Sequence, residues 1–258
     1  MFNPDQLEEQ VQRMPMDRFM AEMQRLKAFV KKNPKNWETR YALALFHLRT
    51  QSTQDALVQL KKAHKLNPRS EIILKTISEV LFLGVKDYKN AFSYLKKWSA
   101  MRKDLAVLWI YLAHCEKEIG RPADALKSLD QAARIDPDQA DLRLNRADVY
   151  TRIGNEEQAQ SEYEAEFEKT GNLAAISGLV ALPNYQPDLE KLREITTEIF
   201  NSEDANIDQT LLSGIGQVFE KLEAFDEAFD CFKRFNDQGV KHIKREEHLA
   251  PFKNVRET

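Results

Sequence analysis

The chain has 258 residues, of which 42% are hydrophobic and 31% are charged, and its formal net charge at pH 7 is −3. This apolar content is too high for a disordered chain, and the charge lacks the basic excess that binding to a nucleic-acid backbone requires. Eight glycines and nine prolines are few for a β-rich protein of this length. We therefore predict an all-α protein with 11 to 14 helices, no β-sheet and no nucleic-acid partner.

Residues 1–33 predict N-terminal capping helices. The opening segment is acidic and polar, without a basic start or an apolar run, so we expect no secretory signal, no membrane span and a cytoplasmic protein. From Met16 to Lys32, apolar residues recur at helical spacing and predict a half-repeat. A methionine stripe here is either core or an adaptable partner surface, which keeps self-association through the terminal helices open. The stripe consists of Met14, Met16, Met20 and Met23.

Small residues recur along the chain at a nearly constant step. The alanines that mark this step are Ala56, Ala91, Ala125 and Ala159, and Ala228 follows after two further steps. The step from Ala56 to Ala91 is one position longer than the two steps after it, and Pro34 and Pro68 are separated by the shorter step. A period of about 34 residues predicts a repeat of two antiparallel helices, which buries its apolar face only by stacking on its neighbours.

The clearest copy of the repeat runs from residue 106 to residue 139. Its first helix carries Trp109, Leu112 and Ala113 on one face and ends at Gly120, because glycine tolerates a left-handed cap. Pro122 suits the first turn of a second helix, which continues with Ala125, Leu129 and Ala132 and stops at Pro137. This pattern resembles the tetratricopeptide-repeat family. The resemblance implies a right-handed superhelical solenoid of antiparallel helix pairs with a concave inner face.

The whole chain is expected to form a single solenoid, with four repeat units over residues 37–171. In the second unit, Ser78 and Glu79 stand where an apolar and a small residue are usual. Residues 172–208 predict a degenerate pair, with helices at Leu173–Leu182 and Leu189–Phe200 on either side of a proline-containing break. Residues 209–258 predict a final unit and a C-terminal helix from Val240 to Val255.

The residues predict neither catalysis nor a metal or cofactor site. Gly214 and Gly216 lie inside a predicted helix and lack the other residues of a phosphate loop, so close helix packing is expected there. The two cysteines, Cys115 and Cys231, match no zinc or redox spacing and predict buried thiols. The spacing of the histidines and nearby glutamates does not suit a metal site. We expect a protein that is not an enzyme.

The family resemblance implies that a protein or peptide partner lies along the first helices of the repeats, in the concave groove. The inward positions are Tyr41, Leu45, Thr76, Ile110, His114, Asn145, Asp148 and Arg152. The alternative for Tyr41 and Leu45 is that they only pad a tightly wound superhelix. The basic and amide residues with which one family subtype clamps chaperone tails are missing from the matching positions, which disfavours that partner.

The segment from Leu211 to Asn236 carries a second resemblance. It runs from a helix with small residues through Asp-Glu-Ala-Phe to an asparagine, and a basic helix follows. It is similar to the final repeat of bacterial proteins that fuse tetratricopeptide repeats to a sulfotransferase. This implies an alternative function, as the regulatory or substrate-recruiting repeat region of a sulfotransferase whose catalytic domain is not in this chain.

Overall fold

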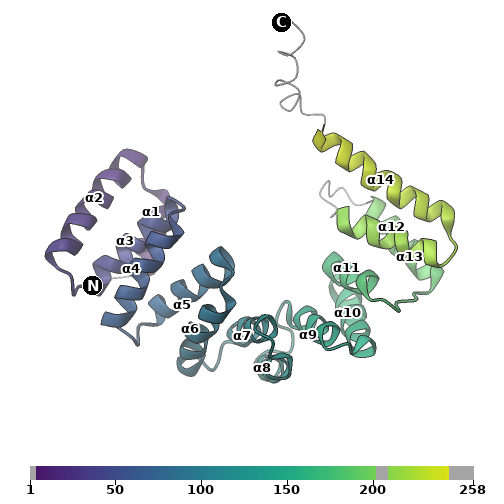
Figure 1. The fold of residues 1–258 in the computed structure, drawn as a ribbon, viewed down its shortest axis with the longest axis horizontal. Helices are drawn as coiled ribbons and strands as arrows, with labels where there is room; N and C mark the ends of the chain where they lie inside the picture. Colours follow the sequence, from purple (N-terminus) through teal and green to yellow (C-terminus); the bar gives the residue numbers. More distant parts are fainter. Residues whose placement is uncertain (1–3, 202–208, 244–258) are drawn as a thin grey trace, which may run out of the picture. The chain divides into compact units, whose positions relative to one another are not determined.

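The computed structural model describes residues 4–201 and 209–243, and these ranges fold into helices joined by short connections (Figure 1). Within them lie fourteen α-helices, one π-helix and no strand, which confirms the predicted all-α class. Contacts between residues divide the chain into two compact units, Met1–Leu142 and Arg143–Thr258.

The N-terminal unit consists of two capping helices and three helix pairs. The helices are α1 (Pro4–Arg13), α2 (Met16–Lys32), α3 (Trp37–Arg49), α4 (Thr53–Leu66), α5 (Glu71–Glu79), η1 (Val80–Val85), α6 (Tyr88–Met101), α7 (Ala106–Glu118) and α8 (Pro122–Ile135). The pairs are α3 with α4, α5 and η1 with α6, and α7 with α8, and consecutive pairs also pack on each other. The predicted half-repeat over Met16–Lys32 is the helix α2.

Local signals in the sequence set where these helices begin. The side chain of Asn36 caps α3 by accepting a hydrogen bond from the Thr39 amide at 2.6 Å. Asp87 caps α6 in the same way, because its carboxylate accepts from the Asn90 amide at 3.2 Å. Each cap satisfies an amide that has no partner within its own helix.

The π-helix η1 accounts for the one long step in the repeat, from Ala56 to Ala91. A residue in the left-handed conformation follows the first helix of each pair, and these residues are Gln51, Lys86 and Gly120. Gln51 and Lys86 are one residue farther apart than Lys86 and Gly120, and the second pair is one residue longer than the third. A π-helix accommodates an extra residue without breaking the helix. The wider turns of η1 are where this pair holds its additional residue.

The extra residue also corrects the expected register of the second unit. We expected Ser78 and Glu79 at the two packing positions, but Ile77 and Ser78 are the buried residues, at 0% and 1% exposure. Glu79 is only half-buried. The reason is that the additional residue comes after these positions, within η1, so α5 keeps the register of α3 up to that point.

The capping helices dock through one arginine at the end of α3. Arg49 donates a hydrogen bond to the Val11 carbonyl of α1. Its guanidinium carbon also lies 4.6 Å from the centre of the Phe19 ring on α2. Phe19 in turn stacks on Phe46 of α3, with 4.6 Å between ring centres. Both rings are almost completely buried, so α1 and α2 close the exposed side of the first pair.

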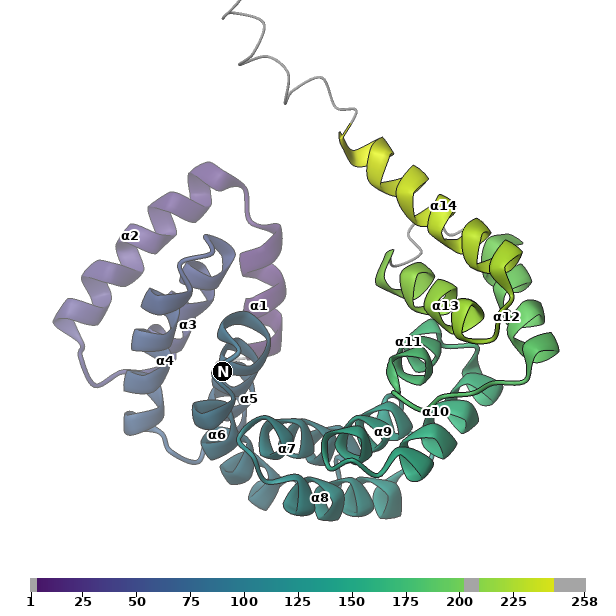
Figure 2. The same cartoon turned by 45° about the vertical axis from the view of Figure 1, so that its right-hand side comes forward.

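The C-terminal unit contains α9 (Leu142–Arg152), α10 (Glu156–Thr170), α11 (Leu173–Ala181), α12 (Leu189–Asn201), α13 (Gln209–Lys221) and α14 (Phe225–Ile243). Its contacts run from α10 to α11, from α11 to α13 and from α13 to α14. Figure 2 shows α13 and α14 side by side. Two of these helices, α11 and α12, begin at the predicted residues. Residues 244–255 of the expected C-terminal helix lie outside the described part of the chain.

Three glycines in this unit, Gly178, Gly214 and Gly216, are contact points between helices. A Cβ atom on Gly178 would lie 2.3 Å from the ring of Tyr163, and one on Gly216 would lie 2.8 Å from the ring of Phe232. These distances leave no room for a methyl group. The prediction that Gly214 and Gly216 serve close helix packing is therefore confirmed, since a Cβ atom on Gly214 would lie 2.6 Å from Val180.

Candidate functional site

Four of the eight predicted partner-binding residues lie in the interior of the N-terminal unit. Tyr41, Leu45, Thr76 and Ile110 are between 0% and 6% exposed. The hydroxyl of Tyr41 lies 3.1 Å from Thr76 Oγ1, which itself donates to the Ile72 carbonyl at 2.9 Å, so Tyr41 is the donor. These side chains join α3 to α5. Their burial is the arrangement that the padding alternative predicts for Tyr41 and Leu45, and it leaves four residues accessible to a partner.

His114, the accessible member in the same unit, belongs to a group of four rings. We call this group the His114 cluster, and it consists of Phe82, Tyr88, Tyr111 and His114, all half-buried. The centre of the His114 ring lies 5.0 Å from that of Phe82 and 5.2 Å from that of Tyr88. Phe82 also lies 5.0 Å from Tyr111. The cluster joins η1, the start of α6 and α7 into one aromatic surface.

The sequence predicted only one member of this cluster. Phe82 lies within η1, and the direction of its side chain follows from the wider turn rather than from regular helical spacing. The sequence signal that could have found Phe82 was the long step from Ala56 to Ala91. It shows that an extra residue changes which side chains share a helix face in this segment. Within the cluster, burial raises the pKa of Tyr111, and the charge of Glu79 adds to that effect. The cluster therefore offers ring faces and edges, and its Tyr111 phenol stays protonated at neutral pH.

The other three predicted residues share one face of α9 in the C-terminal unit. Asn145, Asp148 and Arg152 follow each other at the i,i+3 and i,i+4 spacings that bring side chains together on a helix. The hydroxyl of Tyr163 on α10 donates to Asp148 Oδ1 at 2.8 Å, which fixes this carboxylate. Asn145 and Asp148 are half-buried, whereas Arg152 is exposed. This face of α9 combines an amide, a carboxylate and a guanidinium, the groups that recognise a polar backbone or a charged side chain.

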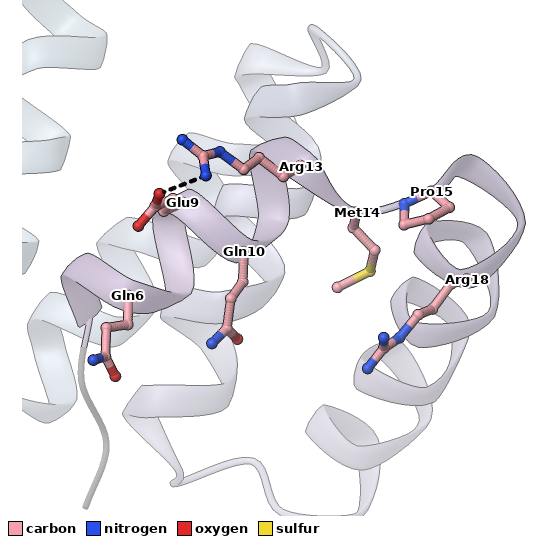
Figure 3. A pocket seen from close by; sticks show the side chains of 7 residues that line it. All are labelled: Gln6, Glu9, Gln10, Arg13, Met14, Pro15 and Arg18. Atoms are coloured by element: carbon pink, nitrogen blue, oxygen red, sulfur yellow. Dashed lines mark ion pairs between the residues drawn. The ribbon is translucent and has the colours of Figure 1, made fainter.

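A recess lies between α1 and the start of α2 (Figure 3). Its volume is about 710 Å³, and long polar side chains line most of it. Glu9 and Arg13 form an ion pair at 3.1 Å, but both side chains are largely exposed, so the pair contributes little. Of the methionine stripe, Met16 and Met20 are exposed while Met23 is buried in the core. The stripe is therefore divided between core and surface.

The thiols of Cys115 and Cys231 are both completely buried. Burial raises the pKa of each to about 12, so neither is a reactive thiolate at neutral pH. In residues 4–201 and 209–243, no group of three or more His, Cys, Asp or Glu side chains is arranged to hold a metal ion. The same residues include no helix that is long and apolar enough to cross a membrane.

Comparison with known proteins identifies the fold. The tetratricopeptide repeat family model matches residues 118–182. A comparison with curated proteins gives no match. A tetratricopeptide repeat protein from Parabacteroides merdae has a similar structure, with a TM-score of 0.64, 15% identity and coverage of 92% of this chain and 93% of that one. MamA from Desulfovibrio magneticus RS-1, from residue 41 to its end, gives a TM-score of 0.53 at 18% identity, with 67% and 99% coverage. The predicted solenoid of tetratricopeptide-like helix pairs is thereby confirmed.

Proposed function

We propose that this chain is a scaffold that binds a partner protein through the first helices of its repeats. The observation that carries this proposal is the His114 cluster, where four rings share contacts yet remain partly accessible. Aromatic side chains are enriched where proteins bind one another, because they bury a large area at a small entropic cost. Stacked repeats also present extended surfaces of this kind to their partners.

The polar face of α9 is the second proposed contact, in the C-terminal unit. Arg152 is exposed, and its guanidinium is suited to a bidentate bond to a carboxylate of the partner, while the Asn145 amide is suited to a backbone amide or carbonyl. Since Asp148 is held by Tyr163, this face is ordered before a partner arrives. An ordered surface loses less conformational entropy on binding. The two faces are proposed independently, one for each unit.

The test is affinity purification from a lysate of the natural source, with the partner identified by mass spectrometry. We expect His114→Ala and Arg152→Ala each to reduce partner recovery, with an affinity loss of about tenfold for a contact worth about 1.4 kcal/mol. Arg134→Ala, which changes an exposed arginine on α8, is the matched control. If both variants recover the partner as well as wild type does, while melting at its temperature, the proposed faces are wrong.

The resemblance of residues 211–236 to sulfotransferase-fused repeats supports a second proposal, that the chain recruits substrates for such an enzyme. The comparisons with known proteins add no support to it. In this case the partner recovered above would be a protein that accepts sulfate or a sulfotransferase domain. Under either proposal the chain itself is not the catalyst, and calorimetry with adenosine 3′,5′-bisphosphate should detect no binding.

A further inference from the structure

A cavity of about 470 Å³ opens between α6, α7 and α8 in the N-terminal unit. The apolar side chains that line it include Phe92, Trp109 and Leu112. Two serines, Ser99 and Ser128, line it where the helices come together, and both are buried. None of these residues belongs to the His114 cluster, so the cavity is a feature distinct from the face proposed above.

The equivalent space one repeat earlier, between α4 and α6, shows why this cavity exists. Counting from the repeat alanines Ala56, Ala91 and Ala125, the position of Ser99 corresponds to His64 and that of Ser128 to Tyr94. The rings of His64 and Tyr94 contact each other edge to face, with 5.3 Å between their centres. At the equivalent positions one repeat later, on α6 and α8, serine side chains replace both rings. The volume that two aromatic rings occupy between α4 and α6 is therefore left open between α6 and α8.

A buried carboxylate lies in the lining of the cavity. Glu116 is 9% exposed, and its Oε2 accepts a hydrogen bond from Ser128 at 2.7 Å. Its other oxygen accepts no hydrogen bond from the described residues, although an ionised carboxylate has capacity for several. Burial raises the pKa of Glu116, which reflects the cost of leaving this charge poorly solvated. A donor that entered the cavity would stabilise it.

Basic side chains surround the mouth of the cavity. Lys96 and Lys103 belong to its lining and are exposed. The guanidinium of Arg121 lies 5.8 Å from the centre of the Phe92 ring, and Lys96 Nζ lies 5.9 Å from the same ring. The nearby carboxylate of Asp124 is already paired with Lys127 at 3.0 Å. The excess of positive charge at the mouth attracts an acidic segment.

We propose that this cavity is a docking site for a tyrosine side chain within an acidic segment of a partner protein. The ring packs against Phe92 and Trp109, in the volume that Tyr94 occupies one repeat earlier. Its hydroxyl donates to the free oxygen of Glu116, and acidic residues on either side pair with Lys96 and Lys103. The ligand thus restores, from another molecule, the packing that the His64 and Tyr94 rings provide between α4 and α6 within the chain.

The probe is a synthetic pentapeptide, Asp-Asp-Tyr-Asp-Asp, acetylated and amidated, titrated into the full chain labelled with ¹⁵N. The signal is the indole N–H resonance of Trp109, identified by its disappearance in Trp109→Phe. We expect a saturable shift of this resonance. Replacing the peptide tyrosine by phenylalanine should weaken binding about tenfold, because the bond to a charged acceptor is lost. Replacing the aspartates by lysines should abolish the saturable shift.

Variants of the chain locate the site. Ser128→Tyr fills the cavity as Tyr94 fills the equivalent space between α4 and α6, and it should reduce binding at least about tenfold. Ser93→Tyr makes the same change at an exposed position of α6 outside the cavity, and binding should match wild type. Ser99→His is the second filling variant, used if Ser128→Tyr lowers the melting temperature. The proposal is overturned if wild type shows no saturable shift, if a folded filling variant binds as well as wild type, or if the phenylalanine peptide binds equally well.

Discussion

Single side chains at the alanine positions decide how closely the two helices of a pair approach. Ala125 is completely buried between α7 and α8, whereas Ala123, two residues earlier, is exposed. Because a leucine at position 125 would force the helices apart, Ala125→Leu should lower the free energy of unfolding by about 1–3 kcal/mol. Ala123→Leu should change it by less than about 0.5 kcal/mol. Chemical denaturation of both variants measures the difference, and equal stabilities would contradict the packing.

Gly178 is a second position where one methyl group matters. Its Cβ atom would lie 2.3 Å from the Tyr163 ring, which is buried and bonded to Asp148. Gly178→Ala should therefore lower the free energy of unfolding by about 1–3 kcal/mol. Gly84→Ala is the matched control, because its nearest neighbour would be Thr53 Cγ2 at 3.9 Å, an ordinary contact. A melt in which the two variants are equally stable would show that Tyr163 moves aside at no cost.

The half-buried carboxyl of Glu79 makes stability depend on pH. Burial raises its pKa in the folded chain above the value of the unfolded chain, with Lys75 opposing the shift and Glu8 adding to it. The folded state therefore holds the proton more tightly, so this contribution to stability is present at low pH and is lost as pH rises through the raised pKa. Glu79→Gln should gain stability relative to wild type between about pH 4 and pH 7. Parallel pH profiles of the two melting temperatures would contradict this.

At the scale of the element, the extra residue in the step from Ala56 to Ala91 is the reason that the fold contains the π-helix η1. Deleting the exposed Leu83 removes the residue that makes the second pair one longer than the third. A regular α-helix can then run from Glu71 to the turn at Lys86, so we expect the free energy of unfolding to change by less than about 1 kcal/mol. The change should instead alter the His114 cluster, because Phe82 loses its wider turn. Near-ultraviolet circular dichroism reports the rearranged rings.

The matched control is deletion of Lys127, an exposed residue in the middle of α8. No surplus residue exists in this helix, so everything after the deletion rotates by about 100°. Leu129 and Ala132 then leave the core, and stability should fall by about 3 kcal/mol or more. If the deletion of Leu83 is as damaging as that of Lys127, the π-helix is not where the extra residue is held.

The sequence predicts helix boundaries well where local spacing determines them. It does not predict whether a side chain is exposed, because that depends on which other helix packs over it. Helical spacing and proline breaks were sufficient to place the starts of α11 and α12. The same spacing identified the inward positions of α3, but it does not say whether a neighbouring helix covers them. Tyr41 is therefore buried against Thr76 rather than exposed on an inner wall. A one-residue insertion also leaves hydrophobic periodicity almost unchanged, which is why the register at Ser78 was missed.

At the scale of the whole molecule, the described residues form two hydrophobic cores with no residue in common. The first core includes buried residues from Val11 to Cys115, and the second includes those from Ala147 to Cys231. In repeat proteins, stability is approximately a sum of local terms and contacts between neighbours. Damage to one core should therefore weaken nearby helices most and distant helices least.

Amide hydrogen exchange on the full chain tests this locality. Leu60→Ala removes a fully buried side chain from the first core and should cost about 2–5 kcal/mol. We expect it to lower protection in α3 to α6 while α13 and α14 keep the protection of wild type, because opening occurs in contiguous cooperative segments. Gly178→Ala should give the reverse pattern, with protection lost in α10 to α13 and retained in α3 and α4. If either variant lowers protection evenly along the whole chain, the two cores unfold as one cooperative body.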